Sequence, residues 1–208
     1  MDILGLYISG FAFGIIGFVC VFVFDLNNAS HNNDHMESLY GLGGGFFGIG
    51  LLLECPNYTI ALPIAVRILM GVLALFFLYG IIFCTYILGK RTRWGKAERE
   101  QGKKNRWWQR PLVDTGLYAL CRHPAVWCMI FFLLCLRCAT GFPVSYTIIY
   151  ILLTVVLSFT EDAFIFPKTI PGFDRYQQTT PLYFPNRESV RRCKATWNDH
   201  KKSTKKRK

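Results

Sequence analysis

Arg122, His123 and Pro124 interrupt an apolar stretch that runs from Tyr118 to Cys135. A permanent cation and a titratable ring are costly at membrane depth, so they indicate a functional site when a partner of opposite charge is at hand. Position alone permits a simpler interpretation. Arg122 would then be an interfacial cation, and Pro124 would stand at the first position of a helix, where no amide hydrogen is needed.

The candidate partners are Glu161 and Asp162, which follow the second of two apolar segments. These segments, Ala125–Cys138 and Val144–Phe159, are joined by a short connection and predict a helical hairpin. Antiparallel helices of similar length would bring His123 and Glu161 to the same end. Carboxylates there could hold hydroxyl or amino groups, and an arginine could hold a carboxylate.

The residues of this site resemble those of a known family. The stretch TGLYALCRHP, from Thr115 to Pro124, is similar to the T-G-x-Y-x4-R-H-P motif of the isoprenylcysteine carboxyl methyltransferase and phospholipid methyltransferase superfamily. Glu161-Asp162 stand where that family has Glu-Glu. Phe173, Tyr176, Pro181 and Pro185 then follow at the family's spacing. The resemblance covers about a third of the chain, from Leu112 to Asn186.

Members of that superfamily are integral membrane enzymes that use S-adenosylmethionine. The resemblance therefore implies methyl transfer to a lipidic or lipid-modified acceptor, either an isoprenylcysteine carboxylate or a phospholipid amine, at the cytosolic membrane face. Arg122 and Glu161 would be catalytic, and the segment from Tyr176 to Pro185 would form a cytosolic lid. The implied cofactor-binding residues are Tyr118, Arg122, His123, Pro124, Cys128, Glu161, Asp162 and Tyr176.

Besides Asp162, which replaces a Glu, three positions depart from the family pattern. Val126 and Cys128 replace a Tyr and a Gly, and Thr179 stands where the prenylcysteine enzymes have an Arg. Two other functions therefore stay open. One is a non-catalytic, lipid-binding relative. The other is a membrane reductase of the sterol-reductase type, because sterol reductases have a distantly similar hairpin core.

The rest of the chain predicts membrane helices. Ile3–Phe24 has no charge over 22 residues, enough to cross a hydrocarbon core of about 30 Å. Gly41–Gly89 contains only Glu54 and Arg67 as charged residues, and the turn-forming Glu54–Tyr58 divides it. With the hairpin, these blocks predict an all-α, polytopic membrane protein with about five transmembrane segments. Four spans with a re-entrant segment are the alternative.

Positive charge is concentrated in two segments, Lys90–Arg110 and Arg187–Lys208, which hold nine and ten of the 24 basic residues. The positive-inside rule places both in the cytosol, where they would attract anionic headgroups rather than nucleic acid. We expect three parts: N-terminal membrane helices with a basic loop (1–111), a methyltransferase-like hairpin and lid (112–186), and a disordered basic tail (187–208). The membrane would be the endoplasmic reticulum in a eukaryote and the plasma membrane in a bacterium.

Smaller signals receive structural interpretations. His31 and His35 have the i,i+4 spacing of metal ligands but lie in a polar loop, and no metal site is expected. The glycines of Gly41–Gly50 resemble a phosphate loop only superficially and are better suited to close helix packing. The eight cysteines are interpreted as small packing residues. The sequence does not indicate an oligomeric state.

Overall fold

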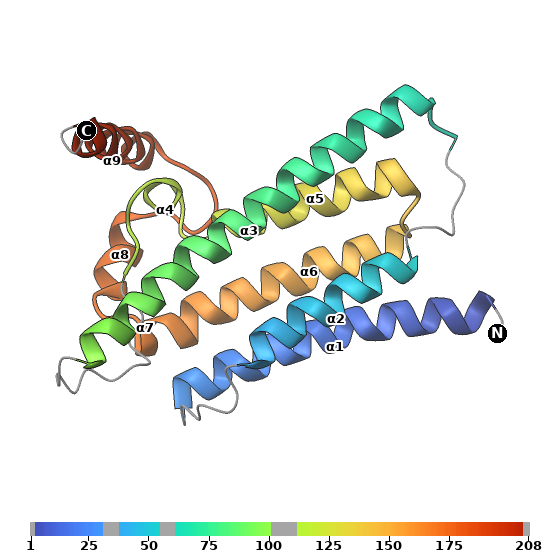
Figure 1. Ribbon diagram of the computed structural model, residues 1–208, viewed down its shortest axis with the longest axis horizontal. Helices are drawn as coiled ribbons and strands as arrows, with labels where there is room; N and C mark the ends of the chain where they lie inside the picture. Colours follow the sequence, from blue (N-terminus) through green and yellow to red (C-terminus); the bar gives the residue numbers. More distant parts are fainter. Residues whose placement is uncertain (1–2, 31–37, 55–60, 101–111, 206–208) are drawn as a thin grey trace. The chain divides into compact units, whose positions relative to one another are not determined.

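The computed structural model describes residues 3–30, 38–54, 61–100 and 112–205 (Figure 1). Every regular element in these ranges is a helix, which confirms the predicted all-α class. The elements are α1 (Ile3–Ser30), α2 (Ser38–Glu54), α3 (Ile64–Glu100), α4 (Leu117–Leu120), α5 (Pro124–Thr140), α6 (Val144–Thr160), the π-helical η2 (Glu161–Ile165), α7 (Phe166–Thr169), α8 (Phe173–Thr179) and α9 (Arg187–Lys205). His31, His35 and most of the Glu54–Tyr58 turn lie outside the described residues.

The chain forms two compact units that interleave along the sequence. The first unit contains Met1–Gly80 and Cys128–Ile165, and the second contains Ile81–Trp127 and Phe166–Lys208. This division differs from the three consecutive segments expected from the sequence, because α3 and α5 each pass from one unit into the other.

In the first unit, α1 and α2 pack along each other through glycines (Figure 1). A Cβ atom added to Gly50 would lie 2.6 Å from the carbonyl oxygen of Gly10, and one added to Gly17 would lie 2.7 Å from that of Gly43. Such short distances show that the two backbones touch, as in small-residue interfaces of membrane helices. Close packing is therefore confirmed for Gly43 and Gly50, whereas a Cβ on Gly44 would meet nothing within 4 Å.

The buried and exposed faces of α6 show the inverted pattern of a membrane helix. Its buried residues are hydroxyl-bearing: Thr147, Tyr150, Thr154 and Ser158. Its exposed side chains are large and apolar: Ile148, Leu152, Val156 and Phe159, each more than half exposed. A water-soluble helix would bury the apolar face and expose the polar one. This arrangement indicates lipid around the first unit.

Three helical segments are long and apolar enough to cross a membrane: Gly10–Ser30, Ile64–Thr85 and Val144–Thr169. The chain is accordingly a membrane protein with transmembrane helices. Two further apolar helices, α2 and α5, have 17 residues each and would be about 25 Å long. Since about 20 residues are needed for a full crossing, five spans remain a prediction.

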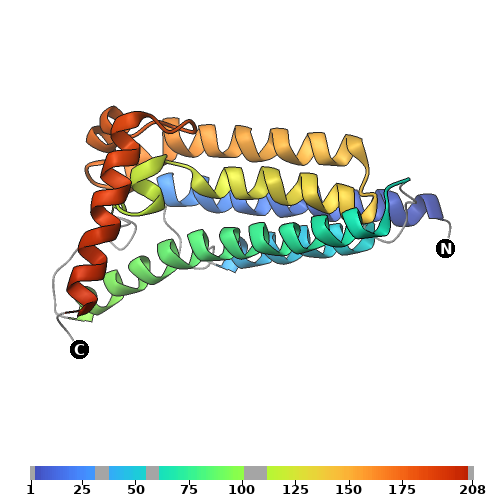
Figure 2. The same cartoon turned by 90° about the horizontal axis from the view of Figure 1, so that it is seen from above.

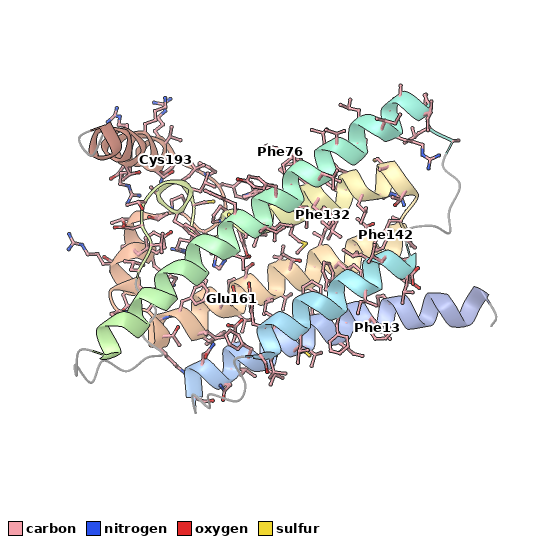
Figure 3. The ribbon with its side chains drawn as sticks, viewed as in Figure 1. Phe13, Phe76, Phe132, Phe142, Glu161 and Cys193 are labelled. Atoms are coloured by element: carbon pink, nitrogen blue, oxygen red, sulfur yellow. The ribbon has the colours of Figure 1, made fainter. Side chains whose placement is uncertain are left out.

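The predicted pair of consecutive apolar helices is present as α5 and α6. The connection begins at Gly141, whose φ of 88° lies in the left-handed region that favours glycine. Its amide donates to the carbonyl of Arg137 at 2.8 Å, and the Arg137 guanidinium donates to the carbonyl of Phe142, also at 2.8 Å. The first bond satisfies a carbonyl in the last turn of α5, and the second satisfies a carbonyl of the connection. Phe142 and Glu161, at the two ends of α6, are labelled in Figure 3.

The second unit is built from short helices and irregular segments. Ile170, Phe173 and Tyr176 form its core, with Leu112 and Phe166 packed against them. The α9 helix runs beside α4 (Figure 2). The sequence predicted disorder from Arg187 onward, and the structure instead has a helix to Lys205. The inner face of that helix has partners within the unit, and those partners were not visible in the sequence.

Candidate functional site

The TGLYALCRHP motif folds as a tight hook in the second unit. Gly116 has φ 62° and ψ −129°, a conformation that side chains with a Cβ rarely adopt. One turn of helix, α4, follows and buries Tyr118. The chain then extends at Cys121, with φ −153° and ψ 161°. The motif therefore has an irregular backbone, and its amides and carbonyls must find partners outside a regular helix.

Those partners come from the segment that the sequence predicted as a lid. The amide of Arg122 donates to the carbonyl of Pro181 at 2.9 Å, and the amide of His123 donates to that of Leu182 at 3.3 Å. Two segments almost 60 residues apart are thus hydrogen-bonded side by side. The pairing joins the first and the third motifs of the family pattern within one unit.

The Arg122 side chain strengthens this pairing. Its Nη1 atom donates to the carbonyl oxygens of Gln177 at 2.8 Å and Thr180 at 3.1 Å, at the C-terminal end of α8. Helix ends leave such carbonyls without an intrahelical partner, and a cation there also suits the helix dipole. In the structure Arg122 is therefore a clamp on α8. Its predicted catalytic role remains a prediction.

Tyrosine and aromatic contacts complete the hook. The Tyr176 hydroxyl donates to the carbonyl of Tyr118 at 2.6 Å, and both side chains are buried. The His123 ring, 7% exposed, stacks on Phe166 with ring centroids 5.7 Å apart and planes 10° from parallel. Pro124 begins α5, as the sequence predicted. The unit thus brings together Tyr118, Arg122, His123, Pro124 and Tyr176.

The other predicted residues belong to the first unit. Glu161 and Asp162 open the π-helical turn η2, where Asp162 is 5% exposed and Glu161 is half-buried. Single π-helical turns are frequent at functional sites. Cys128 packs closely on α3, because a Cβ atom on Gly80 would lie 2.8 Å from its Sγ. The convergence of His123 with Glu161 therefore stays a prediction.

Several polar residues of note were not singled out from the sequence as site residues. Asp25 is 2% exposed near the end of α1, and α1 also contacts η2. Glu54 is fully buried at the end of α2, where its carboxylate lies against the backbone of α1 near Gly10. Trp127 donates from its indole nitrogen to the carbonyl of Tyr183 at 2.9 Å. The sequence could have indicated Asp25 as a buried polar residue, because it is the first charged residue after a 22-residue apolar block.

Within the described ranges, no group of three or more His, Cys, Asp or Glu side chains is arranged to hold a metal ion. Cys135 and Cys138, the two thiols of the C-x-x-C pair, are free. The polar groups of the two units are instead carboxylates, an imidazole, a guanidinium and hydroxyls. These groups can bind amino, hydroxyl and carboxylate functions of organic ligands.

Comparison with curated proteins shows a partial similarity to a metal resistance protein. Over 102 residues the chain is 33% identical to the cobalt-zinc-cadmium resistance protein CzcN of Cupriavidus metallidurans. The match covers 48% of this chain and 44% of that protein, so the chain spans less than half of its relative's length. No family model matches the chain, and no solved structure matches it.

Proposed function

We propose that this chain is a membrane methyltransferase that uses S-adenosylmethionine and methylates a lipidic or lipid-modified acceptor. The observation that carries the proposal is the pairing of Arg122 and His123 with Pro181 and Leu182. These residues belong to separate motifs of the methyltransferase-like pattern, and the fold makes them neighbours. Such a pairing is expected if the motifs form one pocket and is not required for helix packing alone.

The available groups suit that cofactor. The carboxylates of Glu161 and Asp162 can accept hydrogen bonds from ribose hydroxyls and from an amino group. Tyr118 and Tyr176 supply buried aromatic surface. In this proposal Arg122 holds the Tyr176–Pro185 segment in place as a lid, and His123 lies at its base. Bound S-adenosylmethionine supplies a methyl group on a positively charged sulfur, which makes the transfer a displacement with a good leaving group.

The residues of this chain would mainly align the acceptor and exclude water, and positioning of this kind accounts for much of the rate in such reactions. A carboxylate acceptor is already ionised and needs no base. An amine acceptor must be neutral to attack, so His123 or Asp162 would take its proton. The exposed face of α6 is apolar and suited to contact with lipid chains, which is consistent with an acceptor that stays in the bilayer.

Isothermal titration calorimetry of the purified chain in detergent tests the cofactor part of the proposal. We expect saturable binding of S-adenosylmethionine that is weakened at least tenfold by Glu161→Gln, because one charge-assisted hydrogen bond contributes about 1.5–3 kcal/mol. Glu188→Gln is the matched control, since Glu188 is exposed on α9. No binding by the unaltered chain, or equal weakening by both variants, would contradict the proposal.

A role in metal resistance is the second candidate, and the similarity to CzcN favours it. This role is compatible with methyl transfer, because the name of the relative describes a phenotype rather than a reaction. Growth of a metal-sensitive host on graded cobalt, zinc and cadmium tests it. Protection by the unaltered chain but not by Glu161→Gln would link the two functions, whereas equal protection would separate them.

A further inference from the structure

The α9 helix presents two faces with different chemistry. Ser189, Arg192, Cys193 and Thr196 are buried or half-buried and lie on one side of the helix. Arg187, Arg191 and Lys194 are exposed, and their spacing of four and three residues places them together on the opposite side. Figure 3 labels Cys193 on this helix. The outer face is charged, which is not suited to contact with lipid chains, so α9 is not a membrane-spanning segment.

The inner face holds the motif hook. The Gly116 amide donates to the Thr196 hydroxyl at 3.1 Å, and the Arg192 guanidinium donates to the carbonyl of Thr179. These two bonds reach the strained turn before α4 and the end of α8. The position of α9 is therefore linked directly to both segments of the proposed pocket.

The outer face begins three residues after an exposed aromatic side chain. Phe184 is 73% exposed and packs edge-on against Trp127, with ring centroids 5.4 Å apart. In a chain with transmembrane helices, an exposed aromatic cluster that contains a Trp is typical of the bilayer interface. Only Pro185 and Asn186 separate Phe184 from Arg187, so an interfacial Phe184 would bring the first turn of α9 within a few residues of the headgroups.

We propose that the Arg187, Arg191 and Lys194 face of α9 binds anionic lipid headgroups, and that this binding orders the TGLYALCRHP hook through Thr196 and Arg192. Exposed cations beside an interfacial aromatic residue are complementary to an acidic membrane surface. Phosphatidylserine satisfies this chemistry, and zwitterionic phosphatidylcholine does not. The proposal does not depend on methyl transfer.

Hydrogen–deuterium exchange of the full chain in lipid nanodiscs tests this binding. In discs that contain phosphatidylserine, peptides covering 187–205 and 113–121 should both exchange more slowly than in phosphatidylcholine discs. Each interfacial cation contributes about fivefold to binding, so R191Q/K194Q should need about 25-fold more phosphatidylserine for the same protection. K168Q/R175Q removes two exposed cations from α7 and α8 and should behave like the unaltered chain.

Thr196→Val separates binding from coupling. This variant should keep the phosphatidylserine-dependent protection of 187–205 and lose that of 113–121. Equal exchange in the two kinds of disc would overturn the proposal. Equal loss of the phosphatidylserine-dependent protection in R191Q/K194Q and K168Q/R175Q would also overturn it. Protection of 187–205 by an RNA oligonucleotide in phosphatidylcholine discs, without any effect of phosphatidylserine, would assign the face to nucleic acid instead.

Discussion

The two units of this protein hold their helices by different means. In the first unit, α1 and α2 touch through glycines, and each helix satisfies its own backbone hydrogen bonds. In the second unit, the Arg122 side chain and two amides of the motif hook donate to carbonyls of α8 and the segment after it, and the Tyr176 hydroxyl of α8 donates back to the Tyr118 carbonyl of the hook. The difference shows where chemistry can be located. Regular membrane helices leave few polar groups available, whereas an irregular segment brings polar side chains and open carbonyls together.

Replacement of the Arg122 clamp should have the largest effect. Arg122→Met removes both bonds to the end of α8 and should destabilise residues 173–186 by about 4 kcal/mol, because each charge-assisted bond contributes roughly 2 kcal/mol. Hydrogen exchange of that segment measures the loss. Arg175→Met replaces an exposed arginine of α8 and should leave the exchange of residues 173–186 unchanged. Unaltered exchange in Arg122→Met would refute the clamp.

The glycine interface of the first unit comes next. Gly50→Ala should lower the free energy of unfolding by about 3 kcal/mol. Its Cβ would meet the backbone of α1, which cannot rotate away as a flexible side chain does. Gly48→Ala has open space and should be neutral or stabilising by up to about 1 kcal/mol, as helix propensity favours alanine. Unfolding in mixed detergent micelles measures both. Similar stabilities for the two variants would show that the backbones do not touch.

Two positive-φ glycines in the described part of the second unit, Gly116 and Gly172, distinguish strain from crowding, since a Cβ on either would meet nothing within 4 Å. Gly116→Ala should cost about 2 kcal/mol, because φ 62° with ψ −129° lies outside the left-handed helical region. Gly172→Ala, at φ 78° and ψ 10°, should cost about 1 kcal/mol. Thermal unfolding in detergent compares them, and the reverse order would contradict the geometry of the hook.

The smallest effect concerns the tyrosine hydroxyls. Tyr176→Phe should lower the free energy of unfolding by about 1 kcal/mol, the usual net contribution of a neutral hydrogen bond. Tyr118→Phe should lose less, because the Tyr118 hydroxyl is 3.4 Å from its acceptor, the carbonyl of Cys84, compared with 2.6 Å for Tyr176. Chemical unfolding curves of the two variants measure this difference. A greater loss in Tyr118→Phe would place the main contact elsewhere.

The apolar pattern predicted the membrane helices and the all-α class, because long uncharged blocks have few other stable structures in lipid. It also predicted that α5 begins at Pro124. The bonds of Arg122 to Gln177 and Thr180 could not be predicted, because main-chain carbonyls are present at every residue and leave no mark in the sequence. For the same reason the tail was expected to be disordered, since the partners of Thr196 and Arg192 are an amide and a carbonyl.

The activity proposed for this chain is the transfer of a methyl group to a membrane acceptor. Its most direct test is to incubate membranes that contain the protein with methyl-labelled S-adenosylmethionine and follow the label. We predict incorporation into the lipid or lipid-modified fraction, reduced at least tenfold in Glu161→Gln and unchanged in Glu188→Gln. Base-labile label would identify an ester, and stable label in lipid would identify an amine. Label no higher than in membranes without the protein would contradict the claim.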